Sequence, residues 1–342
     1  ASLVSSAIIF SLENIAFTFL VLGFFSLTTI ISINKKLFKK LIIRDVMELI
    51  FLGTGSMIPT QDRNHSATLL CYKNEGILVD CGEGTQKQFR IAKIPITKVT
   101  KVLISHWHGD HVLGLPGLIQ SLEKHHYHNV LEVYGPKGSK KYFDNMFKGF
   151  NYKIGIDYKI KEISKRVFFE NEDFKLESLK LNHIIPCLGY SFIEKDKRKI
   201  NMNYLKKFKL KSHPILKKLQ QGKDIIWEKK KIKVSQATKI KNGKKITFIT
   251  DTGLCSNIQK LVKNSDLMIT EATYKDELEE KAKLYKHLTT KQAALIAKKT
   301  NVKKLILTHF SQRYKDLNEL KKESFEIFKN VEIAKDFLRI SL

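Results

Sequence analysis

Cysteine and acidic residues are scarce in this chain of 342 residues. The four cysteines, Cys71, Cys81, Cys187 and Cys255, form no Cys-x-x-Cys pair, which argues against a disulfide framework and a thiolate zinc knuckle. A reducing, intracellular compartment fits best. Asp and Glu total 34 against 61 Lys and Arg, a formal net charge of +27. This excess favours polyanionic partners such as nucleic acid or an acidic membrane surface, although abundant lysine also serves solubility alone.

Charge is almost absent from residues 1–34, where Glu13 is the one charged side chain. The uncharged run 15–33 approaches the roughly 20 apolar residues that cross a bilayer as a helix. The basic cluster KKLFKK follows it, which would leave the remainder of the chain in the cytosol. We interpret 1–46 as a hydrophobic leader, either a transmembrane helix or a mis-assigned start before Met47. The expected location is cytoplasmic, with membrane anchoring if the leader is translated.

From Met47 onward, short apolar strands alternate with glycine-rich turns and amphipathic helices, which predicts an α/β domain over 47–342. Several of the expected strands end in polar residues, as in LVDCG, LISH, LKLNH, FITDTG, ITEAT and ILTHF. Side chains carried at strand ends lie on one rim of a sheet, where loops shape a site without disturbing the packing. The sequence therefore predicts that these polar residues converge.

The stretch SHWHGDH places three histidines and an aspartate within seven residues, directly after an apolar strand. Imidazole and carboxylate are the usual ligands of zinc and similar ions. Together the strand ends offer seven candidate metal ligands: His106, His108, Asp110, His111, His183, Asp251 and His309. Seven ligands exceed what one zinc ion takes, so two ions that share the Asp251 carboxylate are expected. We interpret His65, His213 and the cluster 125–128 as core or surface histidines.

Six motifs, in order over 47–342, resemble the ribonuclease Z family of the metallo-β-lactamase superfamily. They are MELIFLGTGSMIPTQDRN, LVDCGEGTQKQ, SHWHGDHVLGLPGL, the EAT of ITEATY, HLTTKQAA and THFSQRY. The resemblance implies a metallo-β-lactamase four-layer αβ/βα sandwich, commonly a homodimer, with two Zn²⁺ per subunit. It also implies an endoribonuclease that removes the 3′ trailer from precursor tRNA and leaves a tRNA 3′-hydroxyl. Thr270 stands where the family often has histidine, a departure with little consequence for catalysis.

The resemblance also implies roles for the candidate residues. One zinc would be held by His106, His108 and His183, the other by Asp110, His111 and His309, with Asp251 bridging. Two such ions lower the pKa of a shared water and clamp phosphate oxygens. Asp110 would orient or deprotonate that water, and His287 or Glu271 would give a proton to the leaving ribose oxygen. Alternatively, Glu271 only orients His287.

Substrate selection is expected to depend on other segments. The resemblance assigns Arg63 and Asn64 to reading of the acceptor end, and Ser311 and Arg313 to phosphate or base contacts. A lysine-rich stretch at about 195–223 lies where the family carries an RNA-gripping arm, although its glycine-proline-rich tip is largely missing. Its candidate RNA contacts are Lys197, Arg198, Lys206 and Lys207. The alternatives are another phosphodiesterase of the superfamily and a non-catalytic RNA-binding relative.

Overall fold

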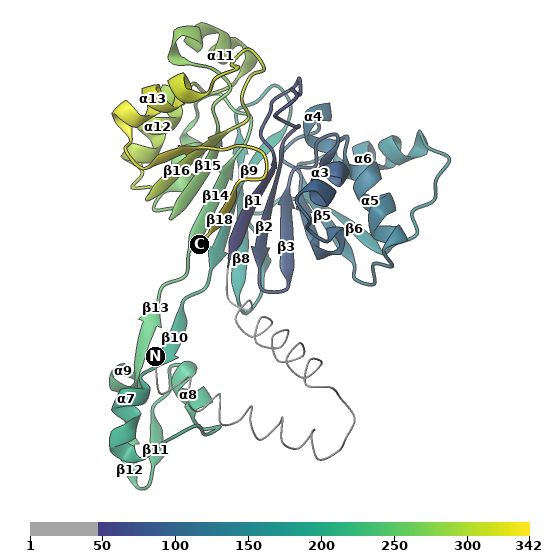
Figure 1. Ribbon diagram of the computed structural model, residues 1–342. Helices are drawn as coiled ribbons and strands as arrows, with labels where there is room; N and C mark the ends of the chain where they lie inside the picture. Colours follow the sequence, from purple (N-terminus) through teal and green to yellow (C-terminus); the bar gives the residue numbers. More distant parts are fainter. Residues whose placement is uncertain (1–46) are drawn as a thin grey trace, which may run out of the picture.

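Two seven-stranded sheets stack face to face in the computed structural model, which describes residues 47–342 (Figure 1). The first sheet has the order β18-β1-β2-β3-β4-β5-β6. Its strands are β1 (Glu48–Gly53), β2 (Ala67–Tyr72), β3 (Glu75–Val79), β4 (Lys101–Leu103), β5 (Leu131–Gly135), β6 (Tyr158–Glu162) and β18 (Arg339–Ser341). The last strand therefore pairs with the first and brings the two ends of the described chain together.

The second sheet has the order β17-β16-β15-β14-β9-β8-β7. Its strands are β7 (Val167–Glu170), β8 (Phe174–Leu181), β9 (Cys187–Glu194), β14 (Lys245–Ile249), β15 (Leu267–Glu271), β16 (Lys304–Thr308) and β17 (Val331–Ile333). Strands β14 to β17 are parallel to one another. Their carboxyl ends therefore lie at the same end of the sandwich, the upper end in Figure 1.

Alternation along the strands explains why both faces of each sheet are buried. In β1, Leu49 and Phe51 pack into the core between the two sheets, whereas Ile50 and Leu52 pack against the outer helices. Successive side chains of a strand point to opposite faces, so a continuous apolar run suits a strand covered on both sides. The run ELIFLG is such a strand.

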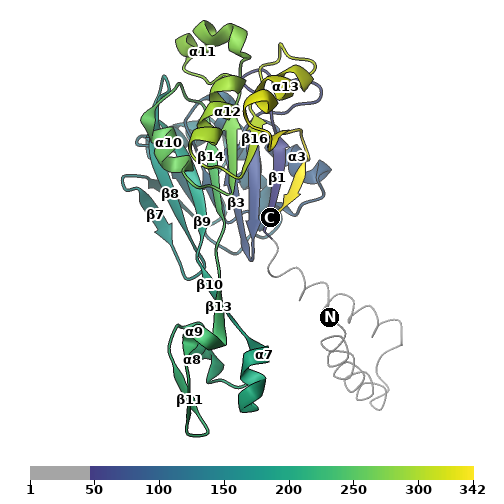
Figure 2. The same cartoon turned by 90° about the vertical axis from the view of Figure 1, so that its left-hand side faces the viewer.

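Helices cover the outer face of each sheet (Figure 2). The first sheet carries α3 (Thr85–Ile91), α4 (Gly109–Val112), α5 (Leu115–Lys124) and α6 (Ser139–Lys148), with the 3-10 turn η2 (Ile96–Lys98). The second carries α10 (Ser256–Val262), α12 (Thr290–Lys299) and α13 (Asn318–Ile327), and the loop from β15 to α12 contains η4 (Asp276–Leu278) and α11 (Glu279–Tyr285). The predicted four-layer αβ/βα sandwich is confirmed.

A small lobe projects from the lower end of the sandwich on a two-stranded stalk (Figures 1 and 2). We call residues 197–241 the arm. It contains β10 (Lys197–Ile200), α7 (Met202–Leu205), η3 (Lys206–Phe208), α8 (Leu216–Gln220), β11 (Ile225–Trp227), β12 (Lys230–Ile232), α9 (Val234–Ala237) and β13 (Thr238–Lys241). The predicted range ended near 223, but the return strand β13 pairs with β10 and the hairpin β11–β12 packs into the same lobe. The arm is thus a folded unit with an apolar core.

The hydrophobic run 15–33 lies outside the described residues. Within 47–342, no helix is both long and apolar enough to span a membrane. Met47 is 2% exposed, and its carbonyl accepts a hydrogen bond from the Leu342 amide at 2.8 Å. The fold therefore includes Met47 itself.

Candidate metal centre

The polar residues predicted to converge do so at the upper end of the sandwich. His106 and His108 follow β4, and Asp110 and His111 belong to the short helix α4. His183 lies in the turn between β8 and β9, Asp251 follows β14 and His309 follows β16. Both sheets thus contribute to one rim, because β4 and the parallel strands of the second sheet end on the same side.

Within each of three groups of side chains, the ligand atoms lie within 4.8 Å of one another, and the third group, Asp251, His287 and His309, shares residues with the other two. The first contains His106, His108, His183 and Asp251, and the second contains Asp110, His111 and His309. Asp251 lies between them. Its Oδ2 is 3.8 Å from His106 Nε2, whereas its Oδ1 is 3.5 Å from His111 Nε2 and 3.3 Å from His309 Nε2. Each carboxylate oxygen therefore faces a different group, the arrangement that a bridging ligand requires.

Three buried atoms at this rim have no hydrogen-bond partner within the described part of the chain: His111 Nε2, His309 Nε2 and Asp251 Oδ1. Burying a polar atom without a partner costs about 1–3 kcal/mol. Three such atoms that converge on one point are well suited to bind a cation. The residues present therefore fit metal binding.

Four of the five histidine rings, those of His106, His111, His183 and His309, are held through their other nitrogen. Asp80 accepts from His111 Nδ1 at 2.7 Å and from the Ser105 hydroxyl at 2.8 Å, and that hydroxyl lies 2.9 Å from His106 Nδ1. The Thr273 hydroxyl lies 3.0 Å from His309 Nδ1, and the Lys286 carbonyl lies 3.1 Å from His183 Nδ1. Such contacts fix the tautomer and orientation of a metal ligand.

Sequence reasoning missed Asp80, Ser105 and Thr273 as supporting residues, although each lies in or beside a quoted motif. Their position at strand ends was the sequence feature that could have indicated them. The contact between Asp80 and His111, however, is visible only in the folded structure. Asp80 and His309 both have left-handed backbone conformations, with φ of 59° and 60°. For residues other than glycine this costs about 1–3 kcal/mol and is typical of functional sites.

Electrostatics couple the carboxylates and histidines. Burial raises the pKa of Asp110, but His111 and His309 outweigh it and hold that pKa below its usual range. Burial lowers the pKa of His111, whereas Asp251, Asp110 and Asp80 raise it well above its ordinary value. The negative charges of the aspartates at the rim are thus balanced by the neighbouring histidines, although the protein as a whole is strongly basic.

Glu271 and His287 form a pair beside the rim. Glu271 is fully buried; its Oε1 accepts from the Thr252 amide at 2.6 Å, and its Oε2 accepts from the Thr273 hydroxyl at 2.6 Å. His287 Nδ1 lies 3.0 Å from both carboxylate oxygens. Burial lowers the pKa of His287, but Glu271 more than compensates and raises it to about 9.

A cleft of about 370 Å³ opens onto the rim. Ser311 and Arg313 line it together with the metal-centre residues and His287. Arg313 lies over the Tyr274 ring at 5.3 Å, and its Nε donates to the Ser311 hydroxyl at 3.0 Å. The guanidinium is therefore held in the wall of the cleft.

Arg63 and Asn64 do not line the cleft. Arg63 Nη2 donates to the Tyr314 carbonyl at 2.8 Å, and Asn64 Nδ2 donates to the Glu83 carbonyl at 2.7 Å. Met57 and Ile58 of the same loop line the cleft instead. In the structure, Arg63 and Asn64 thus hold the loop that forms one wall, and their contact with RNA stays a prediction.

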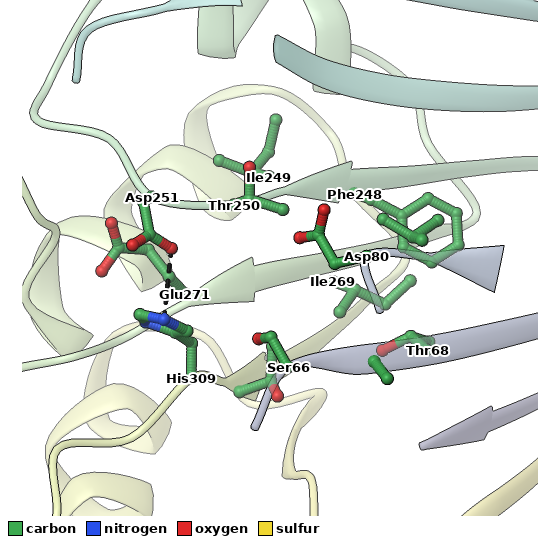
Figure 3. Close-up of a pocket in the computed structure, with 13 residues that line it drawn as sticks. Ser66, Thr68, Asp80, Phe248, Ile249, Thr250, Asp251, Ile269, Glu271 and His309 are labelled. Atoms are coloured by element: carbon green, nitrogen blue, oxygen red, sulfur yellow. Dashed lines mark ion pairs between the residues drawn. The ribbon is translucent and has the colours of Figure 1, made fainter. Parts of the chain in front are cut away.

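Behind the rim, a second and smaller cavity of about 20 Å³ lies between the sheets (Figure 3). Ser66, Thr68, Asp80 and Thr250 line it together with Asp251 and His309. This volume and these polar groups suit one water molecule. It belongs to the support of the metal ligands.

The remaining candidate residues lie elsewhere. Lys206 and Lys207 form the 3-10 turn η3 of the arm, with Lys207 Nζ over the Tyr204 ring at 5.8 Å. Lys197 and Arg198 lie on β10, where both have partners within the chain. His65 is buried, with Nε2 3.1 Å from the Met57 carbonyl, and His213 packs beside Trp227 in the arm. Within 47–342, neither residue belongs to a group that could hold a metal ion, and nor do the histidines in 125–128.

The fold and this rim define a class, the metal-binding hydrolases of the metallo-β-lactamase fold. The family model described as "Beta-lactamase superfamily domain" matches residues 228–310, and the model described as "Anti-Pycsar protein Apyc1" matches residues 47–202. Among solved structures, the metallo-beta-lactamase fold protein YhfI from Bacillus subtilis is similar with a TM-score of 0.64 at 18% identity, covering 87% of this chain and 100% of that chain. That likeness shows the fold.

Closer similarity identifies the family. Ribonuclease Z of Protochlamydia amoebophila (strain UWE25) is 37% identical over 294 residues, covering 86% of this chain and 96% of the relative. Ribonuclease Z of Bacillus cereus (strain AH187) is 38% identical over 299 residues, covering 85% and 97%. The human tRNase Z, short form, has a TM-score of 0.63 at 28% identity, covering 86% of this chain and 98% of that one. The chain belongs to the ribonuclease Z family, which makes it a hydrolase of the endoribonuclease class.

Proposed function

We propose that this protein removes the 3′ trailer from precursor tRNA with two bound Zn²⁺ ions and leaves a 3′-hydroxyl on the tRNA. The observation that carries the proposal is the pair of adjacent ligand groups joined by Asp251, at the floor of a cleft that also contains Arg313. Membership of the ribonuclease Z family supports the substrate class. Histidine nitrogens and carboxylate oxygens are the ligand types that zinc accepts.

In this proposal, His106, His108 and His183 would hold one ion, Asp110, His111 and His309 would hold the other, and the Asp251 carboxylate would serve both. When bound, the two ions supply a nucleophile at neutral pH and a clamp for phosphate oxygens. The residues of the chain then have separate tasks. Asp110 orients the attacking water, and Arg313 with Ser311 holds the phosphate.

His287 donates a proton to the leaving 3′ oxygen, and Glu271 positions His287. The carboxylate of Glu271 keeps the imidazole protonated at neutral pH, since the pKa of His287 is about 9. Glu271 itself is fully buried and has partners in Thr252 and Thr273. This favours the alternative in which Glu271 acts through His287 rather than on the substrate.

The arm supplies selectivity for RNA. Residues 195–241 contain 17 Lys and Arg against three Asp and Glu, a balance suited to phosphate contacts. The arm lies at the opposite end of the sandwich from the rim (Figure 1). Strand β9 alone spans roughly 26 Å, at about 3.3 Å for each residue. A substrate that touches both regions is therefore long and stiff, which favours a folded RNA over a small phosphodiester.

The proposal includes three further points from the sequence: a catalytic unit at 47–342, a leader at 1–46, and a homodimer. The decisive experiment uses the purified protein, a 3′-extended precursor tRNA and added Zn²⁺. We expect one cut after the discriminator nucleotide with a free 3′-hydroxyl, mapped by primer extension and end labelling. Intact precursor at high enzyme concentration, or scattered cuts, would contradict the proposal.

A further inference from the structure

The arm joins the sandwich through an interruption in the backbone ladder. Strands β9 and β14 pair as far as Ile193 and Lys245, and β10 and β13 pair from Lys197 and Lys241 onward. Between the paired residues of the two ladders lie 194–196 and 242–244, where one backbone hydrogen bond crosses, from the Glu194 amide to the Lys244 carbonyl at 2.9 Å. The direction of the arm therefore depends on the contacts that cross this junction.

Asp196 Oδ1 accepts from the Gly243 amide at 2.8 Å, and the Glu194 side chain makes several further contacts. Its Oε1 accepts from the Tyr72 hydroxyl at 2.9 Å and from Lys197 Nζ at 3.1 Å, and its Oε2 accepts from the Lys244 amide at 3.3 Å. Lys197 Nζ also donates to the Tyr72 hydroxyl at 2.9 Å. Gly243 lies so close that an added Cβ would be 2.0 Å from the Glu194 carbonyl oxygen. The two strands at the junction are thus tightly apposed.

These contacts connect three parts of the molecule. Tyr72 ends β2 of the first sheet, Glu194 ends β9 of the second, and Lys197 begins the arm. Tyr72 is 2% exposed, and its ring packs edge-on against Phe192 with centroids 5.1 Å apart. The Glu194 side chain is 10% exposed. Lys197 is 38% exposed, so the shielded part of these contacts is the charge-assisted hydrogen bond from the Tyr72 hydroxyl to the Glu194 carboxylate, which is stronger than a contact on the open surface.

We propose that Tyr72, Glu194 and Lys197 form a latch that sets the direction of the arm relative to the cleft. The three are positioning residues, since none of them lines the cleft. Because the latch spans the interrupted ladder, breaking it frees the arm to sample other directions without unfolding the arm or the sandwich. A long substrate that must contact both regions then loses preorganisation, whereas a small phosphodiester does not. The consequence for RNA depends on the proposed function.

The test uses Tyr72→Phe, which removes only the hydroxyl, and Glu194→Gln, which replaces one acceptor oxygen by a donor. We expect the KM for precursor tRNA to rise by about three- to ten-fold. Both kcat on that substrate and hydrolysis of bis(p-nitrophenyl) phosphate should be unchanged. The direction of the change in RNA affinity is informative for Glu194→Gln. Removing a negative charge near the RNA would tighten binding if charge alone mattered, whereas the latch predicts weaker binding.

Glu170→Gln is a matched control at the same junction. It breaks the Glu170–Lys195 pair, whose side chains are 51% and 38% exposed, and exposed pairs contribute little. Spin labels at Ile226→Cys in the arm and Phe325→Cys on α13, in a Cys255→Ser background, report the direction of the arm. We expect a broader distance distribution in Tyr72→Phe and Glu194→Gln but not in Glu170→Gln.

Unchanged distance distributions, or precursor binding as tight as wild type, would overturn the latch. Equal loss on both substrates would also overturn it, because it would mean that the substitutions damage the sandwich. If the wild-type protein does not cut precursor tRNA, the proposed function fails, yet the spin-label distances still decide whether the latch exists.

Discussion

The metal centre and the arm are built in opposite ways. At the metal centre, buried histidines and carboxylates are held by second contacts from Asp80, Ser105 and Thr273. In the arm, lysines project around a small core of Leu205, Leu219 and their neighbours. The metal centre thus depends on the exact orientation of each side chain. The arm depends on its positive charge, its folded shape and its direction relative to the sandwich. Substitutions in the two regions should therefore affect different steps.

Metal removal is the change with the largest expected effect. Treatment with a chelator, or His108→Ala, should reduce cleavage of precursor tRNA and of a small phosphodiester alike, by roughly a thousand-fold, since metal ions supply several kcal/mol of transition-state stabilisation. Metal content measured by mass spectrometry should fall in the variant, and Zn²⁺ should restore the chelated enzyme. Full activity of His108→Ala with normal metal content would refute the two-ion arrangement. His213→Ala in the arm is the control histidine.

The Glu271–His287 pair should have the next largest effect. His287→Ala is expected to lower kcat on precursor tRNA by about 10²- to 10⁴-fold, the usual range for a general acid. A raised pKa means that His287 stays protonated up to about pH 9, so the rate should fall as pH rises through that value. Glu271→Gln removes the carboxylate that raises this pKa, and the alkaline limb of the pH–rate profile should move to lower pH. An unmoved limb would exclude His287 as the acid.

Excision of the arm should separate the two regions. Replacing residues 197–241 by a short glycine-containing turn removes the whole lobe, whereas deletion of 195–223 alone would cut through its core. Precursor binding should weaken by at least about ten-fold, and the slope of log K against log salt should flatten by about 0.7–0.9 for each lost phosphate contact. Hydrolysis of a small phosphodiester should persist. Loss of both activities would show that the sandwich depends on the arm.

The smallest expected effect concerns the leader. A protein that begins at Met47 should cut precursor tRNA with the same kcat and KM as the full chain, because the seven candidate metal ligands, Ser311, Arg313 and the arm lie within 47–342. The free energy of unfolding of the two forms should also agree. A ten-fold difference in cleavage would assign a role to residues 1–46.

Motifs at strand ends indicated the side chains that the fold brings together at the rim, since an apolar run followed by histidine or aspartate is typical of a strand that ends in a polar residue. The supporting residues were harder to foresee. Asp80 and His111 are 31 positions apart, and Thr273 and His309 are 36 apart. No local pattern shows such contacts. Arg63 and Asn64 lie in a loop that their motif singled out, but the motif did not show that Met57 and Ile58 of this loop line the cleft.

The α/β class, the set of candidate ligands and the basic character of the arm could be predicted from the amino-acid sequence, because they depend on local apolar periodicity and on side-chain chemistry. The packed fold was needed to show which oxygen of Asp251 faces which ligand group, how far the arm extends, and how Tyr72, Glu194 and Lys197 meet at its base. Those features arise from strands that pair across long stretches of chain and from the stacking of two sheets. Such contacts are set by the packing of the whole core, and no short segment encodes them.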